Sequence, residues 1–155
     1  MNKISIFVLR VSTGWLMFYA GIVKILNPEW SALGYMKGAK TFAGFYSLMS
    51  QPNILPIVNF INEWGLTLLG VSLILGVFVR LSSVLGALLM LLYYFPVLSF
   101  PMAGPYSFLV DEHIIYAFVL LFFASVKAGR VWGLEKWCSN LPVCSKFPGL
   151  RSWLG

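Results

Sequence analysis

The chain has 155 residues, of which 59% are hydrophobic and 10% are charged, and its formal net charge is +6. Soluble domains carry roughly 25% charged residues, so this composition excludes an ordinary soluble globular protein. The length allows one compact unit and no second domain. The basic residues flank apolar segments, which indicates lipid head groups rather than nucleic acid as their partner.

Four long apolar segments follow one another along the chain. They cover Ile4–Ile25, Ile57–Val79, Leu81–Pro96 and Ile114–Val126. A bilayer core about 30 Å thick is crossed by roughly 20 apolar residues in a helix, and in lipid a helix satisfies its own backbone N–H groups. The first two segments meet this length, and the other two meet it when their polar ends are counted. The sequence predicts an all-α membrane protein, a four-transmembrane-helix antiparallel bundle in the lipid bilayer of the cell membrane.

The first segment places charge and small residues on one helical face. Arg10 and Lys24 lie towards its two ends, and Gly14, Met17 and Gly21 recur between them at helical spacing. Small residues let a neighbouring helix approach closely. An arginine at membrane depth stays charged, so Arg10 either extends to lipid head groups or holds a polar group or ligand inside the bundle.

The connections between the segments differ in length. Residues 26–56 carry apolar and aromatic side chains at roughly helical spacing between Pro28 and Pro52. This pattern predicts a short amphipathic or re-entrant helix at the membrane interface or over the mouth of the bundle. Ser99–Val110 contains prolines and a glycine, which predicts an irregular cap. The turn at Arg80 is very short and predicts an antiparallel hairpin of the second and third helices.

Charged side chains from three helices meet near one end of the predicted bundle. They are Lys24, Glu63, Asp111, Glu112 and His113. Ionisable groups at membrane depth usually face a cavity or one another and mark a functional site. Each of them also has a structural explanation. Acidic residues at a helix start suit the helix dipole, and a lysine at a helix end reaches towards head groups.

Depth separates Arg10 from this group. Helical rise places Arg10 roughly 9 Å from one membrane face and Glu63 at a similar depth from the other, within a core of about 30 Å. The two side chains are therefore too far apart to pair directly. We expect Arg10 to serve one half of the bundle, and Glu63 to pair with Lys24 or His113 in the other half.

His113 is the only histidine of the chain. Histidine changes charge near neutral pH, which suits proton transfer coupled to a redox reaction. A histidine beside two carboxylates is equally explained as a structural hydrogen-bond partner. One histidine and scattered carboxylates do not make a tetrahedral metal site, haem lacks a second axial ligand, and no dinucleotide fingerprint is present. We expect no metal, haem or flavin.

The basic residues predict the orientation of the chain in the membrane. One face collects Lys3, Arg80, Lys127, Arg130, Lys136, Lys146 and Arg151, and the opposite face collects Lys24, Lys37 and Lys40. The excess of cations on the first face predicts that both termini are cytoplasmic. Residues 137–155 mix tryptophan, proline and cations, which is typical of an interfacial tail. We expect its two cysteines, Cys138 and Cys144, to be free thiols.

Several short motifs occur in a characteristic order. They are Arg10-Val-Ser-Thr-Gly14, Gly21-Ile-Val-Lys24, Glu63, Leu75-Gly76-Val-Phe-Val-Arg80, His113, Ala128-Gly129-Arg130 and Gly133-Leu134-Glu135. In this order the chain resembles the DoxX-like family of small four-helix membrane proteins over about residues 5–136, so residues 1–136 form the expected membrane domain. The stretches Asn27-Pro-Glu-Trp30, Gly38-Ala-Lys-Thr-Phe42 and Asp111-Glu-His-Ile-Ile-Tyr116 make it most similar to the DoxD branch.

The resemblance implies an activity. A DoxD-type subunit belongs to a membrane thiosulfate:quinone oxidoreductase, which joins two thiosulfates into tetrathionate and passes two electrons to quinone. Quinone is then a diffusible electron acceptor, and the enzyme includes a second subunit, DoxA. The resemblance therefore predicts an oxidoreductase subunit with a DoxA-like partner, and a homodimer is a further expectation.

On this hypothesis the candidate residues fall into three groups. The catalytic candidates are Glu63, His113 and Asp111, the substrate-binding candidates are Lys24, Lys37, Lys40 and Arg10, and the quinone-contact candidates are Tyr19, Tyr93 and Tyr116. The alternative is a non-catalytic membrane partner or assembly protein, in which the polar cluster is a structural network or a docking point. Transport finds less support, because four spans without an inverted repeat are few for a transporter.

Overall fold

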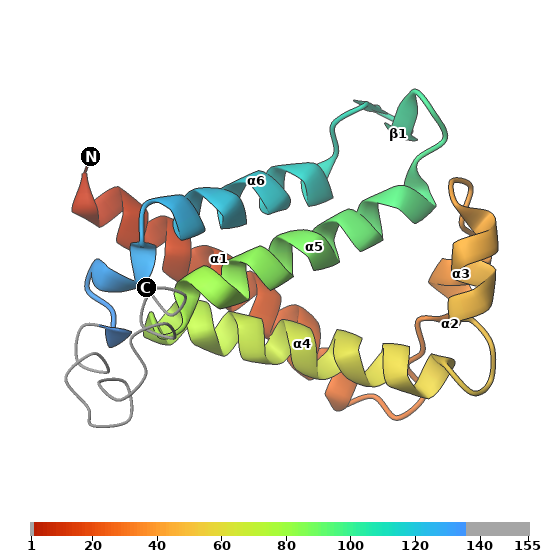
Figure 1. The fold of residues 1–155 in the computed structure, drawn as a ribbon, viewed down its shortest axis with the longest axis horizontal. Coiled ribbons are helices and arrows are strands. Elements are labelled where there is room, and N and C mark those ends of the chain that lie inside the picture. The colour runs from red at the N-terminus through yellow and green to blue at the C-terminus, as the bar shows by residue number, and fades with distance from the viewer. Residues whose placement is uncertain (1, 136–155) are drawn as a thin grey trace.

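The computed structural model describes residues 2–135, which are mostly helical (Figure 1). In chain order the elements are α1 (Lys3–Ile25), α2 (Leu33–Lys37), α3 (Ala43–Met49), α4 (Leu55–Leu75), α5 (Val79–Val97), β1 (Met102–Gly104), β2 (Ser107–Phe108), α6 (Glu112–Ser125) and the 3-10 helix η1 (Ala128–Arg130). Within this part of the chain, α1, α4 and α5 are long and apolar enough to cross a membrane, and α6 is a shorter apolar helix of 14 residues. The predicted tail at 137–155, with both cysteines, lies outside the described residues.

The helix ends follow from capping residues and turns. Asn2 caps α1, because its side chain accepts a hydrogen bond from the backbone N–H of Ile4 (3.0 Å). The helix α4 ends before Gly76, which adopts a left-handed conformation (φ 68°). The second helix therefore ends earlier than the predicted Ile57–Val79. Arg80 lies in the first turn of α5 and not in the connection itself.

The packing of α1 against α4 is the most extensive contact between helices. Gly14, Met17 and Gly21 are buried, as their shared helical face predicts. A Cβ atom on Gly14 or Gly21 would collide with α4, and one on Gly70 would overlap the backbone of Phe18. The two helices approach this closely only because side chains are missing at these glycines.

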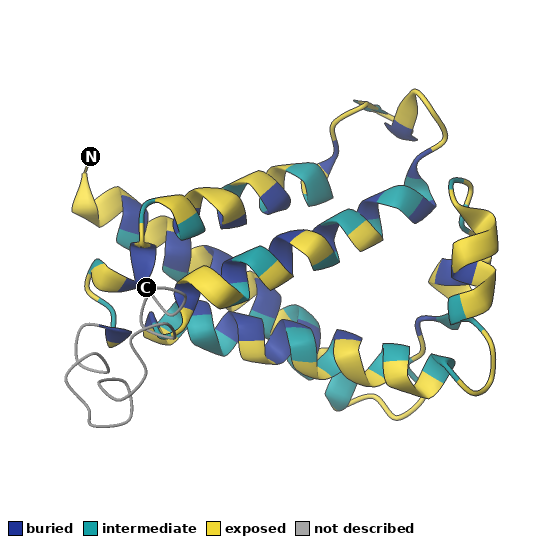
Figure 2. Ribbon diagram, in the orientation of Figure 1, coloured by how far each residue is buried: buried dark blue, intermediate teal, exposed yellow. Residues whose placement is uncertain are grey.

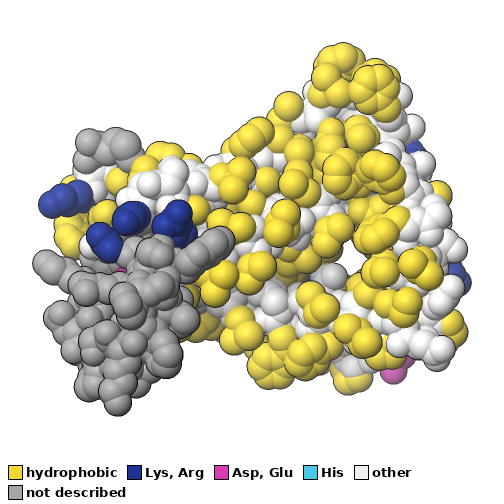
Figure 3. Space-filling view, in the orientation of Figure 1, with side chains coloured by type: hydrophobic (Ala, Val, Ile, Leu, Met, Phe, Trp, Pro, Cys, Tyr) yellow, Lys and Arg dark blue, Asp and Glu magenta, His cyan; other side chains and the backbone are white. Residues whose placement is uncertain are grey.

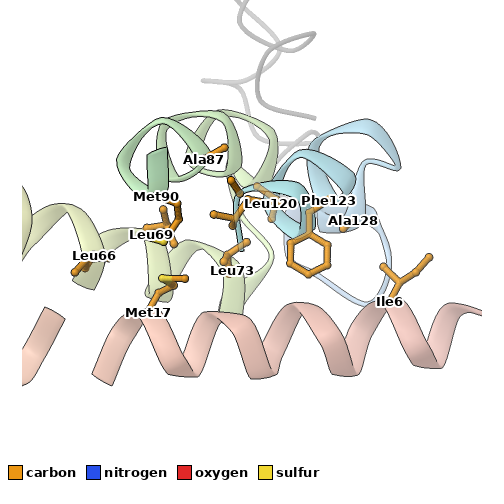
Figure 4. Packing of buried hydrophobic residues seen from close by; sticks show 12 residues of the cluster. Ile6, Met17, Leu66, Leu69, Leu73, Ala87, Met90, Leu120, Phe123 and Ala128 are labelled. Carbon is orange, nitrogen blue, oxygen red and sulfur yellow. The ribbon is translucent and has the colours of Figure 1, made fainter. Parts of the chain in front are cut away.

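A continuous apolar core lies between the helices (Figure 4). Leu73, Leu120 and Phe123 are fully buried at its centre, and Met17 reaches it from α1. The helix α6 runs along α5 and contributes two of these side chains (Figure 1). Lipid tails are as apolar as leucine, so this core is held by van der Waals packing rather than by exclusion of water.

The long helices expose residues along their outward faces (Figure 2), and many of these residues are large and apolar. Exposed large side chains on α1, α4, α5 and α6 include Val8, Trp15, Tyr19, Phe60, Leu68, Leu85, Leu88 and Phe118. In the view of Figure 3, hydrophobic side chains cover most of the middle of the molecule. Soluble proteins rarely expose apolar patches of this extent, and such a surface fits contact with hydrocarbon.

The helices α4 and α5 form an open pair. They are joined by the short turn at residues 76–78 and then diverge towards their other ends (Figure 1). They contact each other much less than α1 contacts α4 or α5 contacts α6. An apolar groove of about 730 Å³ lies between them. The most extensive helix contacts are therefore α1–α4 and α5–α6, and α4 and α5 contact each other less although they are adjacent in the sequence.

The connection between α1 and α4 forms two short helices instead of the one predicted. Tyr46 of α3 donates its hydroxyl hydrogen bond to the backbone carbonyl of Leu92 (2.9 Å). That carbonyl has no helical N–H partner, because Pro96 stands four residues later. Tyr35 of α2 donates in the same way to the carbonyl of Tyr93 (2.5 Å). The two tyrosines therefore fasten this connection to the last turns of α5.

The second connection is more regular than predicted. Within Ser99–Val110, β1 pairs with β2 in antiparallel fashion, and Met102 lies opposite Phe108. This hairpin lies beyond the start of α6 (Figure 1). We call the end of the molecule with residues 26–54 and 99–111 the loop end. The opposite end, with the amino terminus, residues 76–78 and residues 126–135, is the turn end.

Substitution of Gly70 by alanine tests the α1–α4 contact. The added Cβ overlaps the backbone of Phe18, and overpacking of this kind costs about 1–3 kcal/mol. We expect Gly70→Ala to lower the thermal unfolding temperature of the protein in detergent. Gly65→Ala is the matched control, since its nearest neighbour, Ile61 Cγ2, lies 4.0 Å away. Equal unfolding temperatures for the two variants would contradict the packing described.

Candidate functional site

Lys24, near the end of α1, forms a hydrogen-bonded group with α4 and α5. Its ammonium donates to Asn62 Oδ1 (3.4 Å) and to the Tyr93 hydroxyl (3.2 Å). The Tyr93 hydroxyl donates in turn to the same Asn62 oxygen. An ammonium carries three N–H donors, so one donor of Lys24 remains for another acceptor. This polar group joins three helices at the loop end.

Two aromatic rings lie close to the ammonium of Lys24. Its Nζ lies 4.7 Å from the centre of the Trp30 ring and 5.3 Å from that of Tyr93. Tyr35 stands edge-on to Tyr93, with ring centres 6.0 Å apart. Burial, reinforced by the negative charge of Asp111, raises the pKa of Tyr35 to about 12. The phenol of Tyr35 therefore remains protonated at physiological pH and acts as a hydrogen-bond donor.

Asp111 and His113 form a second polar pair at the start of α6. Asp111 Oδ1 accepts a hydrogen bond from the backbone N–H of Ile114 (3.1 Å), which makes Asp111 the cap of the helix. Asp111 Oδ2 lies 2.6 Å from His113 Nδ1. A carboxylate at Nδ1 fixes the ring orientation and places a proton on that nitrogen. Nε2 is then the ring nitrogen that is free to exchange protons.

Two cavities open at the loop end, and we name them by their linings. The tyrosine cavity, about 330 Å³, is lined by Leu16, Met17, Ala20, Lys24, Trp30, Ser31, Ala32, Tyr35, Asn62, Leu66, Met90, Tyr93, His113 and Tyr116. The acidic cavity, about 630 Å³, is lined by Gly34, Tyr35, Gly38, Lys40, Pro96, Val97, Ala103, Gly104, Pro105, Ser107, Asp111, Glu112 and His113. Tyr35 and His113 line both cavities and therefore stand between them.

The structure brings some of the candidate residues together and separates others. Lys24, Tyr93, His113 and Tyr116 line the tyrosine cavity, and Lys40, Asp111 and His113 line the acidic cavity. Lys37 is exposed and lines neither of the two. Tyr19 also lines neither, and with 59% of its surface exposed it faces away from the core. Of the three tyrosines named as quinone contacts, two share a cavity.

Glu63 does not make the ion pair that the sequence suggested. It is half-buried, and among the described residues neither Lys24 nor His113 forms a salt bridge with it. Lys24 bonds to the preceding residue, Asn62, because helical rotation turns that side chain towards the bundle. Glu63 acts on Lys24 only through its electric field. Its backbone carbonyl accepts a hydrogen bond from Thr67 (2.7 Å).

A second polar cluster lies at the turn end. Arg10 is fully buried, and its Nη2 donates to the carbonyl of Val131 (3.2 Å). Its Nε and Nη1, and both carboxylate oxygens of Glu135, have no hydrogen-bond partner among the described residues. Burial raises the pKa of Glu135, and the positive charges of Arg130 and Arg10 oppose this shift. A Cβ atom on Gly76 would overlap Arg10 Nη1, so this glycine makes room for the guanidinium.

Sequence reasoning missed Asn62 and the link between Arg10 and Glu135. Asn62 carries no charge, but an amide buried in an apolar segment is costly to leave without a hydrogen-bond partner. Its position within an apolar segment was therefore the sequence signal for a partner. Glu135 stood within a recognised motif, yet only the fold brings it to the side of Arg10. The expected separation of Arg10 from Glu63 agrees with the structure, since Arg10 lies beside Val131 and Gly76, whereas the Glu63 carbonyl lies beside Thr67 and Gly21.

The charge of Glu135 should make stability depend on pH. Because burial raises the pKa of Glu135, the folded chain keeps this proton to higher pH than the unfolded chain does. Stability is therefore greatest below the ordinary carboxyl pKa, and it falls as pH rises through the raised value. Glu135→Gln should remove this fall in unfolding titrations in detergent between about pH 4 and 8. The exposed Glu29→Gln should retain it, and identical slopes in the two variants would refute this assignment.

Comparison with known proteins identifies the family. Residues 5–98 match the model of the DoxX family, which is more than half of the chain, so the chain belongs to this family. The matched region runs from α1 to the end of α5 and includes Lys24, Asn62 and Tyr93, whereas Asp111 and His113 lie outside it. No curated protein and no solved structure matches the chain.

Proposed function

We propose that this member of the DoxX family is the membrane subunit of a quinone-reducing oxidoreductase, with the tyrosine cavity as its quinone site. On the DoxD-like motifs we assign the reaction as thiosulfate:quinone oxidoreduction. Two thiosulfates then form one tetrathionate and release two electrons, and quinone takes up these electrons with two protons to become quinol.

The tyrosine cavity is the observation that carries this proposal. A quinone headgroup is a flat, apolar ring with two carbonyl oxygens that accept hydrogen bonds. The cavity combines apolar walls, such as Met17 and Leu66, with the unused donor of Lys24 and the ring of His113. Its volume of about 330 Å³ falls at the lower end of the range for small-molecule sites, about 300–1,000 Å³. The cavity therefore supports a headgroup rather than a whole long-chain quinone.

For the topology we propose four crossings, with both termini cytoplasmic and the loop end outside. Basic side chains gather at the turn end (Figure 3), where the described ones are Lys3, Arg80, Lys127 and Arg130. This distribution supports a cytoplasmic turn end through the positive-inside bias. A helix of 14 residues spans only about 21 Å. We therefore propose that the segments flanking α6 complete the fourth crossing.

For thiosulfate we propose capture at the outer surface. Lys37 and Lys40 are exposed there and attract a dianion. Asp111 and Glu112 line the acidic cavity beside Lys40 and oppose the entry of a dianion into it. We therefore assign the remainder of the thiosulfate site to a second, DoxA-like subunit, and the quinone site to this chain.

A non-catalytic membrane partner is the second candidate function, and one observation favours it. Lys24, Asn62 and Tyr93 satisfy one another by hydrogen bonds, and Asp111 caps α6. Such a network also serves to hold helices together without any ligand. Quinone co-purifying with the protein in lipid extracts would support the enzyme, and a stable protein partner without bound quinone would support this alternative.

Lys24→Met tests the quinone site. The assay is thiosulfate-dependent reduction of a short-chain ubiquinone analogue by the purified protein, alone and with its DoxA-like partner. A hydrogen bond from a charged donor contributes about 1.5–3 kcal/mol, so we expect KM for the analogue to rise roughly 10- to 100-fold. Lys3→Met, at the opposite end of α1, is the matched control. Unchanged KM in Lys24→Met would exclude Lys24 from the site.

Cysteine labelling tests the topology. In intact cells, a membrane-impermeant maleimide should label a Ser47→Cys variant in α3 and should leave Cys138 and Cys144 unlabelled. After permeabilisation the two native cysteines should react. A variant with both native cysteines replaced by serine and Ser47 unchanged is the control for background. Labelling of the native cysteines in intact cells would reverse the proposed orientation.

A further inference from the structure

The proposed reduction of quinone consumes two protons, and the structure limits the face from which they can come. The inference rests on the proposed function, because it concerns proton supply to the tyrosine cavity. His113 and Tyr35 are the residues that line both the tyrosine cavity and the acidic cavity. The acidic cavity is open at the loop end, and its carboxylates attract protons and hydrated cations.

His113 has the contacts that a proton carrier needs. Asp111 is held in place as the cap of α6 by the N–H of Ile114 (3.1 Å), and its second oxygen lies 2.6 Å from His113 Nδ1. Its negative charge stabilises an imidazolium and keeps the ring from rotating freely. Of the His113 side chain, 20% is exposed. The ring is thus partly sheltered and still reachable by water.

The groups around His113 belong to several elements. On the side of the acidic cavity they are Lys40, Asp111 and Glu112, and on the side of the tyrosine cavity they are Lys24, Tyr93 and Tyr116. Tyr93 and His113 have ring centres 5.8 Å apart. Tyr35, the other shared residue, has its hydroxyl bonded to the carbonyl of Tyr93. Of the two shared residues, His113 is therefore the one whose ring can both accept and release a proton.

The opposite direction is closed by the apolar core. Leu73, Leu120 and Phe123 are fully buried between the tyrosine cavity and the turn end (Figure 4). Among the described residues, the buried polar side chains between the two ends are Thr13, Thr67 and Ser83, and none of them is ionisable. Arg10 and Glu135 lie on the turn-end side of these three side chains, next to Val131 and Gly129 respectively. An apolar layer with no buried ionisable side chain among the described residues thus separates the tyrosine cavity from the turn end.

We infer that His113 delivers both protons of quinone reduction from the loop-end face, with Asp111 as the residue that positions it. Water in the acidic cavity protonates Nε2 to form the imidazolium. The Nε2–H bond then breaks as the proton passes to a quinone oxygen, and His113 returns to the neutral form with its proton on Nδ1. Two such transfers, with two electrons from the joining of two thiosulfates, convert quinone into quinol.

This arrangement has a consequence for energy conversion. Thiosulfate and protons enter from the same face of the membrane, and electrons reach quinone without crossing the apolar core. The reaction therefore moves no net charge across the bilayer. Quinol formed here stores the energy of thiosulfate oxidation for enzymes that reoxidise it, but its formation does not itself generate a membrane potential.

Substitutions at His113 and Asp111 test the carrier. His113→Gln keeps a polar side chain but cannot exchange a proton, and general acid catalysis contributes at least about 10²-fold. We expect kcat to fall by about that factor with little change in KM for the ubiquinone analogue, and the loss of activity at rising outer pH to disappear. Asp111→Asn still caps the helix but does not stabilise the imidazolium, so its activity should decline at lower pH than that of the unsubstituted protein. Glu29→Gln is the control.

Oriented proteoliposomes, with orientation measured through Ser47→Cys labelling, test the direction. With thiosulfate and the analogue added, a pH dye should report alkalinisation on the loop-end side, and a potential-sensitive dye should show no signal. Alkalinisation of the other side, or a membrane potential, would overturn the inference. So would an unchanged pH profile in His113→Gln, with turnover intact. Absence of turnover in the unsubstituted protein, with and without its partner, would instead overturn the proposed function itself.

Discussion

The close approach of α1 and α4 is the contact on which both polar clusters depend. Gly21 lies one turn before Lys24, and a Cβ at that glycine would collide with α4. Because the helices touch there, the Lys24 side chain reaches both Asn62 and Tyr93. At the other end the same pairing holds Arg10 beside Gly76. A wider separation of the helices would leave two cations at membrane depth without these partners, which is costly in hydrocarbon.

The length of the apolar segments and the helical spacing of residues decided how much of the fold the sequence could predict. Apolar length predicted the long helices, and α1 begins within one residue of its predicted start at Ile4, because hydropathy is a local property. The face of Gly14 and Gly21 was also predictable from helical spacing. The end of the second helix was not predictable from apolar length, because Gly76 ends the helix while the apolar segment continues beyond it. The hairpin within Ser99–Val110 depends on pairing between short strands that lack alternating hydrophobicity.

The site itself was only partly predictable. The sequence placed Lys24 and His113 at one end of the bundle, and both line the tyrosine cavity. It paired Glu63 with Lys24 or His113, whereas Lys24 bonds to Asn62. A shift of one residue rotates a side chain by about 100° around a helix, and charge alone does not fix that rotation. The role of Tyr35 depends on how α2 folds against α5, which no local pattern in the sequence specifies.

The way the connection between α1 and α4 is fastened constrains the order of biosynthesis. Tyr35 and Tyr46 bond to carbonyls of Tyr93 and Leu92, which lie near the end of α5. Leu92 and Tyr93 leave the ribosome well after α2 and α3. The α1–α4 pair can therefore assemble in the membrane first, whereas α2 and α3 reach their final position only after α5 has been inserted. The part of the tyrosine cavity that Tyr35 lines is thus completed late in maturation, although Tyr35 is synthesised early.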